Sequence, residues 1–334
     1  MATPLSWAAG DVAGLHPAQS LAARLSLRGR DFLSLHDWTP EELAAALQTA
    51  RELKLRHRSG QRDQPLRGKT LGMIFAKAST RTRVSFEVGI FQLGGQAIFL
   101  NPADLQLGRG ETIADTARVL SRYLDGIMIR TYDHREVQEL ARWAEIPVIN
   151  GLTDREHPCQ VLADLLTIWE RKGRLRGLKL AFVGDGNNMA HSLLHGGAKF
   201  GMHVAVASPP GYGPDPEVVA EARADAAETG ARITLTDDPA EAVRDADVVY
   251  TDVWASMGQE AEREVRLRAF RGYTVDRNLM ALARPDAIFM HCLPAHRGEE
   301  VAPEVIDGPQ SVVWDQAENR LHAQKAVMLL TMQD

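Results

Sequence analysis

Short apolar runs alternate along the chain with longer stretches whose apolar residues recur at helical spacing. The first helix is expected to start at Thr39-Pro40-Glu41-Glu42, because Thr39 can cap it, Pro40 suits its first position and Glu42 can close a capping box. It should run to about Arg58. Further helices are expected over residues 82–93, 112–123, 137–144, 159–172, 189–200, 216–228, 239–244 and 319–332. Strands are expected over residues 71–75, 97–100, 126–129, 148–150, 179–183, 203–207, 232–234, 248–251, 288–290 and 312–314.

Alternating strands and helices are typical of parallel sheets with helical crossovers. The elements form two such series, which meet near residue 160. We therefore expect an α/β fold with two lobes, each a mostly parallel sheet flanked by helices. Sites in parallel sheets lie beyond the carboxyl ends of the strands, so the active site is expected in the crevice between the lobes.

Composition restricts the class of protein further. At roughly 150 residues per domain, 334 residues correspond to two domains, and 45% apolar with 25% charged residues excludes global disorder. Two cysteines cannot form a disulfide framework, which favours a reducing, cytoplasmic location. A net charge of −6 provides no overall positive electrostatic field that would attract nucleic acid. No apolar run reaches the ~18 residues of a membrane span, and the first 30 residues lack the pattern of a secretory signal.

The first candidate motif is Ser79-Thr80-Arg81-Thr82-Arg83, between a predicted strand and a predicted helix. Backbone N–H groups at a helix start favour an anion, and hydroxyls and arginines strengthen the effect. This motif predicts a phosphate or carboxylate site. The alternative is a capped helix whose arginines face solvent.

The second candidate is His157-Pro158-Cys159-Gln160, just before a long predicted helix. A residue before proline is extended, which holds the His157 ring at the helix start, where a neutral imidazole could bind a polar substrate group. A cap-region histidine bonded to backbone is the alternative. Arg130, at the end of the strand over 127–129, is expected on the same sheet edge.

The third candidate, Gly184-Asp185-Gly186-Asn187-Asn188-Met189-Ala190, has the G-x-G-x-x-A spacing of a dinucleotide fingerprint. That fingerprint also requires an acidic residue about 20 positions later, and the next strand instead ends at Ala207-Ser208-Pro209. A nicotinamide-linked oxidoreductase is therefore a minor alternative. Asn187 and Asn188 could instead bind the carboxylate of a small substrate.

The fourth candidate pairs the segment 252–258 with His291-Cys292-Leu293-Pro294, because both follow predicted strands of the second lobe. Asp252 suits the ammonium of an amino-acid-like ligand. Cys292 could be a nucleophile assisted by His291 or His296, a metal ligand or a substrate-contacting thiol. Adjacent strand residues face opposite ways, so His291 and Cys292 are poorly placed to act together. A metal-dependent hydrolase using these residues with His157 and Cys159 is a second minor alternative.

In combination, these motifs resemble the ornithine carbamoyltransferases, within the wider aspartate/ornithine carbamoyltransferase group. The resemblance runs from about Arg30 to Gln324. It rests on four segments that match family motifs: Ser79-Thr80-Arg81-Thr82-Arg83, His157-Pro158-Cys159-Gln160, the segment from Asp252 to Gly258 with its Ser-Met-Gly run, and His291-Cys292-Leu293-Pro294. Residues 1–30 are read from the sequence as an N-terminal extension. The resemblance implies a carbamoyl phosphate-binding domain over 31–165 completed by a terminal helix over 319–334, and an ornithine-binding domain over 166–318.

The resemblance also implies roles for single residues. Carbamoyl phosphate would be bound by Ser79, Thr80, Arg81, Thr82, Gln106 of a neighbouring subunit, Arg130, His157, Gln160, Cys292, Leu293 and Arg320. Ornithine would be bound by Asn188, Asp252, Ser256 and Met257. Arg81, Arg130, His157, Asp252 and Cys292 would act in catalysis.

These assignments imply direct attack of the ornithine δ-amine on carbamoyl phosphate, giving citrulline and phosphate without a covalent enzyme intermediate. The family also implies a homotrimer or a multiple of trimers with shared active sites, and no metal or organic cofactor. Neither nucleic acid nor a membrane is an expected partner. A carbamoyltransferase for another amine, and a binding or regulatory protein that retains the anion site without turnover, are the remaining alternatives.

Overall fold

The computed structural model describes residues 27–105, 110–255 and 262–333. Contacts divide the chain into two compact units. Among the described residues, the first unit comprises 27–166 and 318–333, and the second comprises 167–255 and 262–317. Each unit contains one parallel sheet with helices on it, which confirms the expected fold class.

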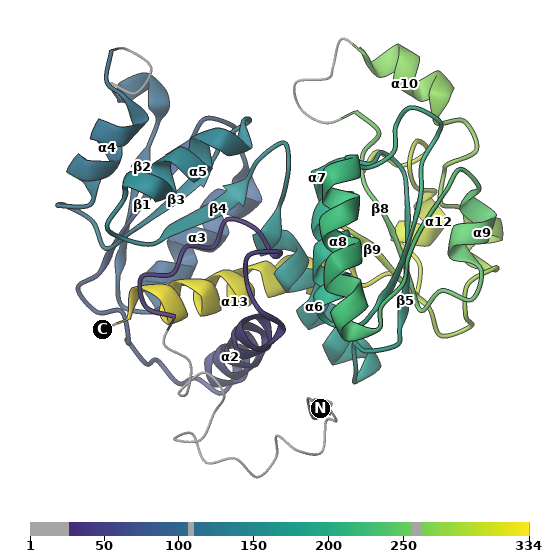
Figure 1. Ribbon diagram of the computed structural model, residues 1–334. Coiled ribbons are helices and arrows are strands. Elements are labelled where there is room, and N and C mark those ends of the chain that lie inside the picture. Colours follow the sequence, from purple (N-terminus) through teal and green to yellow (C-terminus); the bar gives the residue numbers. More distant parts are fainter. Residues whose placement is uncertain (1–26, 106–109, 256–261, 334) are drawn as a thin grey trace. The chain divides into compact units, whose positions relative to one another are not determined.

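The first unit contains a four-stranded parallel sheet in the order β2-β1-β3-β4 (Figure 1). Its strands are β1 (Thr70–Phe75), β2 (Gln96–Leu100), β3 (Gly126–Arg130) and β4 (Val148–Leu152). Its helices are α2 (Pro40–Arg58), α3 (Thr80–Gln92), η2 (Pro102–Asp104), α4 (Ile113–Leu120), α5 (His134–Trp143) and most of α6 (Pro158–Lys172). Strands β3 and β4 are buried throughout, as continuous apolar strands of parallel sheets are.

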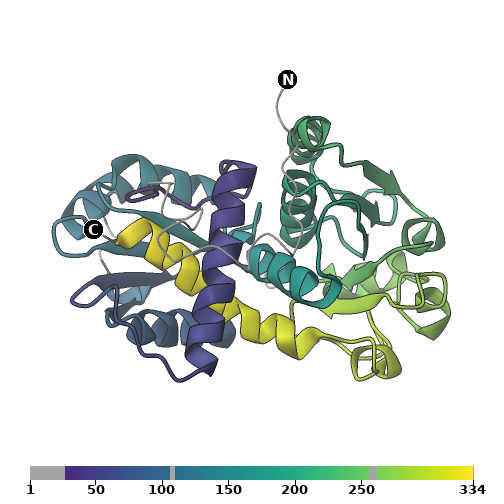
Figure 2. The same ribbon diagram turned by 90° about the horizontal axis from the view of Figure 1, so that it is seen from below.

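Helix α2 starts as its sequence predicts. The Thr39 hydroxyl accepts the Glu42 N–H at 3.2 Å, and the Glu42 carboxylate accepts the Thr39 N–H at 2.8 Å. The helix then crosses the C-terminal helix α13 (Val313–Met332), as Figure 2 shows. Lys54 donates to Asn319 at 2.7 Å, and Arg58 bonds the Glu318 carboxylate. These contacts attach residues of α13 from Glu318 onward to the first unit.

The second unit contains a five-stranded parallel sheet in the order β7-β6-β5-β8-β9. Its strands are β5 (Lys179–Val183), β6 (His203–Ala207), β7 (Ile233–Thr236), β8 (Val248–Thr251) and β9 (Ile288–His291). Its helices are α7 (Asn188–Lys199), α8 (Pro216–Thr229), α9 (Pro239–Val243), α10 (Arg263–Ala269), α11 (Arg277–Met280) and α12 (Pro303–Ile306). Helices α7 and α8 lie side by side on one face, and α9 lies on the other (Figure 1).

The expected strand over 312–314 is wrong, because helix α13 already begins at Val313. Before the helix, the backbone makes only an isolated bridge, between Ser311 and Phe289 of β9. Val312 and Val313 are buried, and a short apolar run does not distinguish a strand from the first turn of a buried helix. Within the described residues, no helix is long and apolar enough to cross a bilayer.

Candidate active site

The carboxyl edge of the four-stranded sheet carries the first two candidate motifs. Phe75 of β1 pairs with Arg130 of β3, and Arg130 also pairs with Leu152 of β4. The segment with Ser79 follows β1, and the segment with His157 follows β4. Arg130 therefore lies on the same edge as both motifs, as expected from the parallel topology.

Ser79 is the N-cap of α3, where its hydroxyl accepts the N–H of Thr82 at 3.2 Å. Thr80 is exposed in the first turn, Arg81 is half-buried and Thr82 is fully buried. Arg83, in contrast, faces solvent, bonds Glu87 at 3.0 Å and covers the ring of Phe99. The expectation of two arginines at the anion site is therefore wrong for Arg83, because helical periodicity turns it outward.

The Thr82 hydroxyl accepts hydrogen bonds from two buried arginines. It accepts from Arg130 at 3.3 Å and from Arg320 of α13 at 2.9 Å. Arg320 also donates to the Gln160 side chain at 2.9 Å, and Gln160 donates to the buried Asp164 at 2.9 Å. Two buried guanidinium groups beside a helix N-terminus make a positively charged environment suited to a phosphate group.

His157 lies buried in the same positive surroundings. Burial lowers the pKa of its imidazole well below the usual value, and the charges of Arg320, Arg130 and Arg81 lower it further. At neutral pH the ring is uncharged, so it can donate one hydrogen bond and accept another. A neutral ring could hydrogen-bond a polar substrate group, and this role of His157 stays a prediction.

Cys159 is fully buried, which argues against its use in the hydrolytic metal centre considered from the sequence. Its thiol donates to the carbonyl of Asn150 at 3.4 Å, and burial raises the pKa of the thiol to about 12. A protonated, buried thiol is neither a nucleophile nor a metal ligand. The side chain belongs to the core because Pro158 starts α6 and Cys159 faces inward in its first turn.

The carboxyl edge of the second sheet brings three candidate side chains together. Asp252 follows β8, and its carboxylate accepts from Asn187 at 3.0 Å through one oxygen. The other oxygen accepts from the thiol of Cys292, which follows β9, at 3.0 Å. Asp252 is 6% exposed and Cys292 is half-buried. Asn188, expected to bind ornithine, is the half-buried first residue of α7, whereas Asn187 caps that helix.

Cys292 follows the last residue of β9, and one nitrogen of the His291 ring lies within 4.8 Å of the Cys292 thiol. The His291 ring accepts the Leu293 N–H at Nδ1, 2.8 Å away, and lies 3.2 Å from Glu300 through Nε2. Both ring nitrogens are therefore engaged by groups other than the Cys292 thiol. The hydrogen bonds of His291 to Leu293 and Glu300 argue against a Cys292 nucleophile activated by His291, and against a hydrolytic metal centre that uses both residues. Leu293 itself has a positive φ of 59°, which turns the chain sharply.

The dinucleotide-like segment has no space for a pyrophosphate. In dinucleotide-binding folds the second glycine lets the backbone approach the pyrophosphate. Here a Cβ on Gly186 would lie 2.2 Å from the carbonyl carbon of Gly213 and 2.2 Å from the Pro214 nitrogen. The chain's own backbone thus occupies the place of the phosphate, which argues against the oxidoreductase alternative.

Asp185 and Arg266 form a buried ion pair that the sequence did not reveal. The Arg266 guanidinium lies 2.9 Å from the Asp185 carboxylate and donates to the Trp254 carbonyl at 3.0 Å. It also bonds Glu262 and lies over the Tyr212 ring. Desolvation raises the pKa of Asp185 to about 6, although Arg266 lowers it. The pair links the segment after β8 to the segment after β5. The one sequence signal for it is an acidic residue, Asp185, that directly follows a predicted strand.

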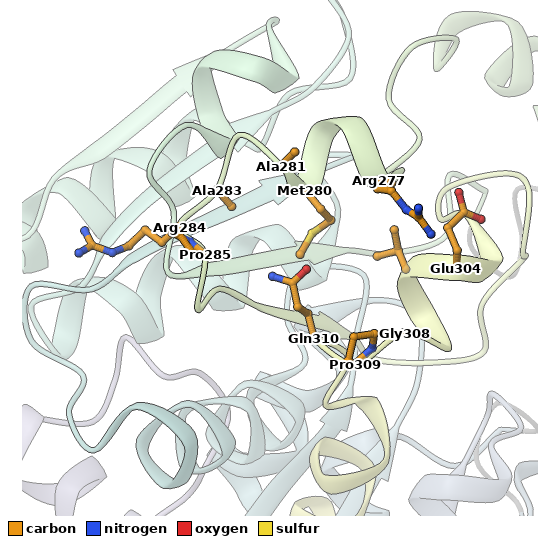
Figure 3. Close-up of a pocket in the computed structure, with 11 residues that line it drawn as sticks. Arg277, Met280, Ala281, Ala283, Arg284, Pro285, Glu304, Gly308, Pro309 and Gln310 are labelled. Atoms are coloured by element: carbon orange, nitrogen blue, oxygen red, sulfur yellow. The ribbon is translucent and has the colours of Figure 1, made fainter.

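Three expected site residues, Gln106, Ser256 and Met257, lie outside the described residues, as do residues 1–26 of the expected extension. A hollow of about 520 Å³ occurs elsewhere in the second unit, where Met280 and Gln310 point into it (Figure 3). Ala283 and Pro285, which also line it, precede β9, whereas His291 and Cys292 end or follow that strand. No expected site residue lines this hollow.

Two family models match the chain. The model described as aspartate/ornithine carbamoyltransferase, carbamoyl-P binding domain, matches residues 30–170, and the one described as the Asp/Orn binding domain of the same family matches residues 176–331. The second match includes α13 residues that cluster with the first unit.

Among curated proteins, the chain is 69% identical over 307 residues to an ornithine carbamoyltransferase of Symbiobacterium thermophilum, covering 92% of this chain and 99% of the relative. It is 62% identical to an ornithine carbamoyltransferase of Thermococcus kodakarensis, covering 92% of this chain and 98% of the relative. Among solved structures, the ornithine carbamoyltransferase from Pyrococcus furiosus is similar with a TM-score of 0.90, at 61% identity, covering 92% of this chain and 98% of that one.

Proposed function

The chain belongs to the aspartate/ornithine carbamoyltransferase family, and on that basis we propose that it transfers the carbamoyl group of carbamoyl phosphate to the δ-amine of L-ornithine. The products are L-citrulline and phosphate. The observation that carries the proposal is the pair of buried arginines, Arg130 and Arg320, on the Thr82 hydroxyl at the start of α3. Full-length relatives named ornithine carbamoyltransferase support the choice of acceptor.

The first unit supplies the donor-binding residues in this proposal. The N-terminal N–H groups of α3, with Ser79, Thr80, Arg81 and Thr82, bind the phosphate, and Gln160 and Arg320 complete the site. Arg130, the neutral His157 and Thr82 donate to the carbonyl oxygen as it becomes an oxyanion, and each preorganised donor of this kind contributes about 3 kcal/mol. Arg81 and Arg130 stabilise the departing phosphate.

The second unit supplies the acceptor-binding residues. Asp252 and Cys292 orient the ornithine, with Asn188, Ser256 and Met257 as further contacts and the backbone at Cys292 and Leu293 facing the carbamoyl group. A free amine has a pKa of ~10, so the δ-ammonium must lose a proton before attack. Desolvation and neighbouring arginines favour that loss, and the leaving phosphate can accept the proton. The amine attacks directly, so no covalent enzyme intermediate forms.

We further propose a homotrimer, or a multiple of trimers, in which Gln106 completes a neighbouring subunit's site. Exposed apolar side chains on the first unit support this proposal. Val84, Val88 and Phe91 follow one face of α3 with exposures of 50%, 37% and 76%, and Ile98 on the edge strand β2 is 40% exposed. Several large apolar side chains exposed on neighbouring elements are typical of an interface. A cytoplasmic location is proposed with it, because a reducing compartment maintains free thiols such as Cys159 and Cys292.

The test is a citrulline assay with carbamoyl phosphate and ornithine, run beside aspartate, putrescine and N-acetylornithine. Turnover with ornithine alone supports the proposal. Preference for another amine would identify that amine, and not ornithine, as the acceptor. Arg81→Ala should abolish turnover, whereas Arg83→Ala is the matched control because Arg83 faces solvent. Equal activity of the two variants would contradict the anion-site assignment. Saturable binding of a reduced nicotinamide dinucleotide would instead support the oxidoreductase alternative.

A further inference from the structure

The turn that follows the Leu293-Pro294 peptide carries an imidazole and two carboxylates side by side. The Nδ1 atom of His296 lies 4.0 Å from one Glu299 oxygen and 3.8 Å from one Glu300 oxygen. These ligand atoms all lie within 4.8 Å of one another. Imidazole and carboxylate are ligands that zinc accepts, and a tetrahedral ion needs them only slightly closer together.

Glu300 provides an independent indication of a ligand at this place. The residue is fully buried, and its Oε2 atom has no hydrogen-bond partner among the described residues. Its Oε1 atom accepts the His296 backbone N–H at 2.5 Å and faces His291 Nε2 at 3.2 Å. A buried carboxylate oxygen without a donor is costly, and here it points toward the His296 ring.

Among the described residues, the Glu300 carboxylate is paired with two histidines, His291 and His296, and with no arginine or lysine. The His291 ring accepts the Leu293 N–H at Nδ1, so the neutral ring carries its proton at Nε2 and brings no charge to Glu300. Arg263 bonds the other Glu299 oxygen, and Arg297 is paired with Asp307 at 2.8 Å. The Glu300 carboxylate therefore faces a neutral His296 ring without an arginine or lysine partner among the described residues, and His296 is 48% exposed and accessible to a cation from solvent.

The backbone of the turn is held in place before any ion binds. Glu299 N–H donates to the His296 carbonyl at 2.9 Å, and Gly298 N–H donates to the Val301 carbonyl at 2.8 Å. The carbonyl of Glu300 accepts the Val275 N–H at 2.9 Å. Ion binding then requires only side-chain rotations, which keeps its entropic cost low.

We propose that His296, Glu299 and Glu300 bind a divalent transition-metal ion of the zinc type, with water at the remaining position. The neighbouring group of Asp252, His291 and Cys292 also has ligand atoms within 4.8 Å of one another. It is less suitable, because both nitrogens of His291 are engaged and the Cys292 thiol is bonded to Asp252. The new site lies outside the residues assigned to carbamoyl transfer.

The test is zinc binding to the full chain by titration calorimetry, after treatment with a chelator and removal of any histidine tag. We expect one ion per chain, and at least about a tenfold higher Kd in His296→Asn and in Glu299→Gln, because each variant removes one of three protein ligands. Asp307→Asn is the matched control, since that carboxylate is exposed and bonded to Arg297. Absence of zinc binding, or equal affinity in all variants, would overturn the proposal.

Cobalt distinguishes the two groups of ligands. Co²⁺ bound to His296 and the carboxylates gives no thiolate charge-transfer band. The Cys292→Ser variant should bind Co²⁺ with the same affinity as the wild type. A thiolate band that disappears in Cys292→Ser would place the ion on Cys292 and overturn the proposed site. A kinetic consequence rests on the proposed function: a bound cation should raise the KM for the cationic ornithine in the wild type but not in His296→Asn. Binding itself is measured without turnover, so failure of the two proposals is distinguishable.

Discussion

Arg320 of the C-terminal helix donates to the hydroxyl of Thr82, which lies 238 positions earlier in the chain, at 2.9 Å. The same guanidinium donates to Gln160, so one side chain joins the helix after β1 to the helix after β4. Arg320 is 3% exposed. The terminal helix therefore supplies a charged group to the proposed phosphate site as well as packing area to the first unit.

Arg320→Lys should lower kcat/KM for carbamoyl phosphate by about 100-fold, because a lysine cannot bond Thr82 and Gln160 together. Arg58→Lys is the control, since Arg58 bonds Glu318 of the same helix but is exposed. Steady-state kinetics with carbamoyl phosphate varied gives the comparison. Equal loss in both variants would indicate a packing role for Arg320 instead.

Cys292 is expected to orient the acceptor without forming a covalent bond. Its thiol donates to Asp252, and a serine hydroxyl can make the same bond. Cys292→Ser should therefore retain turnover within about tenfold of the wild type, whereas loss of a true nucleophile costs roughly 10⁴-fold or more. Mass spectrometry after mixing with carbamoyl phosphate should detect no carbamoylated enzyme. A carbamoyl adduct that disappears in Cys292→Ser would contradict direct amine attack.

Gly186→Ala tests the close approach of two loops in the second unit. The added Cβ would lie 2.2 Å from the backbone of Gly213, so the segment that carries Asn187 must move away from Asp252. We expect a higher KM for ornithine, an unchanged KM for carbamoyl phosphate and a lower melting temperature. At Gly213 a Cβ would meet no atom within 4 Å, which makes Gly213→Ala the control. Unchanged ornithine kinetics in Gly186→Ala would show that this contact does not position Asn187.

Local signals account for the parts of the fold that the sequence predicts well. The capping box at Thr39 and Glu42 fixes the start of α2 through residues three positions apart, and it forms as expected. Arg130 is placed on the correct edge because parallel strands align their carboxyl ends. The start of α13 was missed because Val312 and Val313 carry no periodicity that separates a strand from a helix.

Long-range pairing accounts for the rest. Arg266 has no local pattern that relates it to Asp185, since the ion pair exists only after β5 and β8 have aligned. The outward direction of Arg83 depends on which face of α3 the core covers, and that face is set by tertiary packing. The burial of Cys159 likewise follows from the position of α6 within the unit and not from its motif.

Asp185 should give the second unit a distinctive pH dependence. Its pKa is raised from 3.8 to about 6 on folding, so the folded state binds the proton more tightly than the unfolded state. Its contribution to the free energy of unfolding is therefore present below about pH 4 and is lost as the pH rises through about 6. A shift of about two pKa units corresponds to a change of about 3 kcal/mol in the free energy of unfolding.

Urea denaturation between pH 4 and 6 measures this effect: the free energy of unfolding of the wild type should fall relative to that of Asp185→Asn as the pH rises, because an asparagine does not ionise. Asp307 is the control with the opposite sign, because hydrogen bonds from Arg297 lower the pKa of its carboxyl. The stabilisation by Asp307 is lost as the pH falls, so Asp307→Asn should approach the wild type under acid conditions. A constant difference for Asp185→Asn would show that burial does not perturb this carboxyl.

Phe91→Asp tests whether the exposed apolar face of α3 mediates assembly. Phe91 is 76% exposed. A charge at this position would be desolvated at an interface, which weakens assembly, but would stay solvated in an isolated subunit and leave its folding free energy unchanged. We expect sedimentation velocity to show a trimer or its multiple for the wild type and smaller species for Phe91→Asp. Leu55→Asp, at a position 59% exposed on α2, is the control and should retain the wild-type assembly. Because Gln106 is proposed to act in a neighbouring subunit's site, dissociation should also abolish citrulline formation; an active, dissociated Phe91→Asp protein would contradict shared sites.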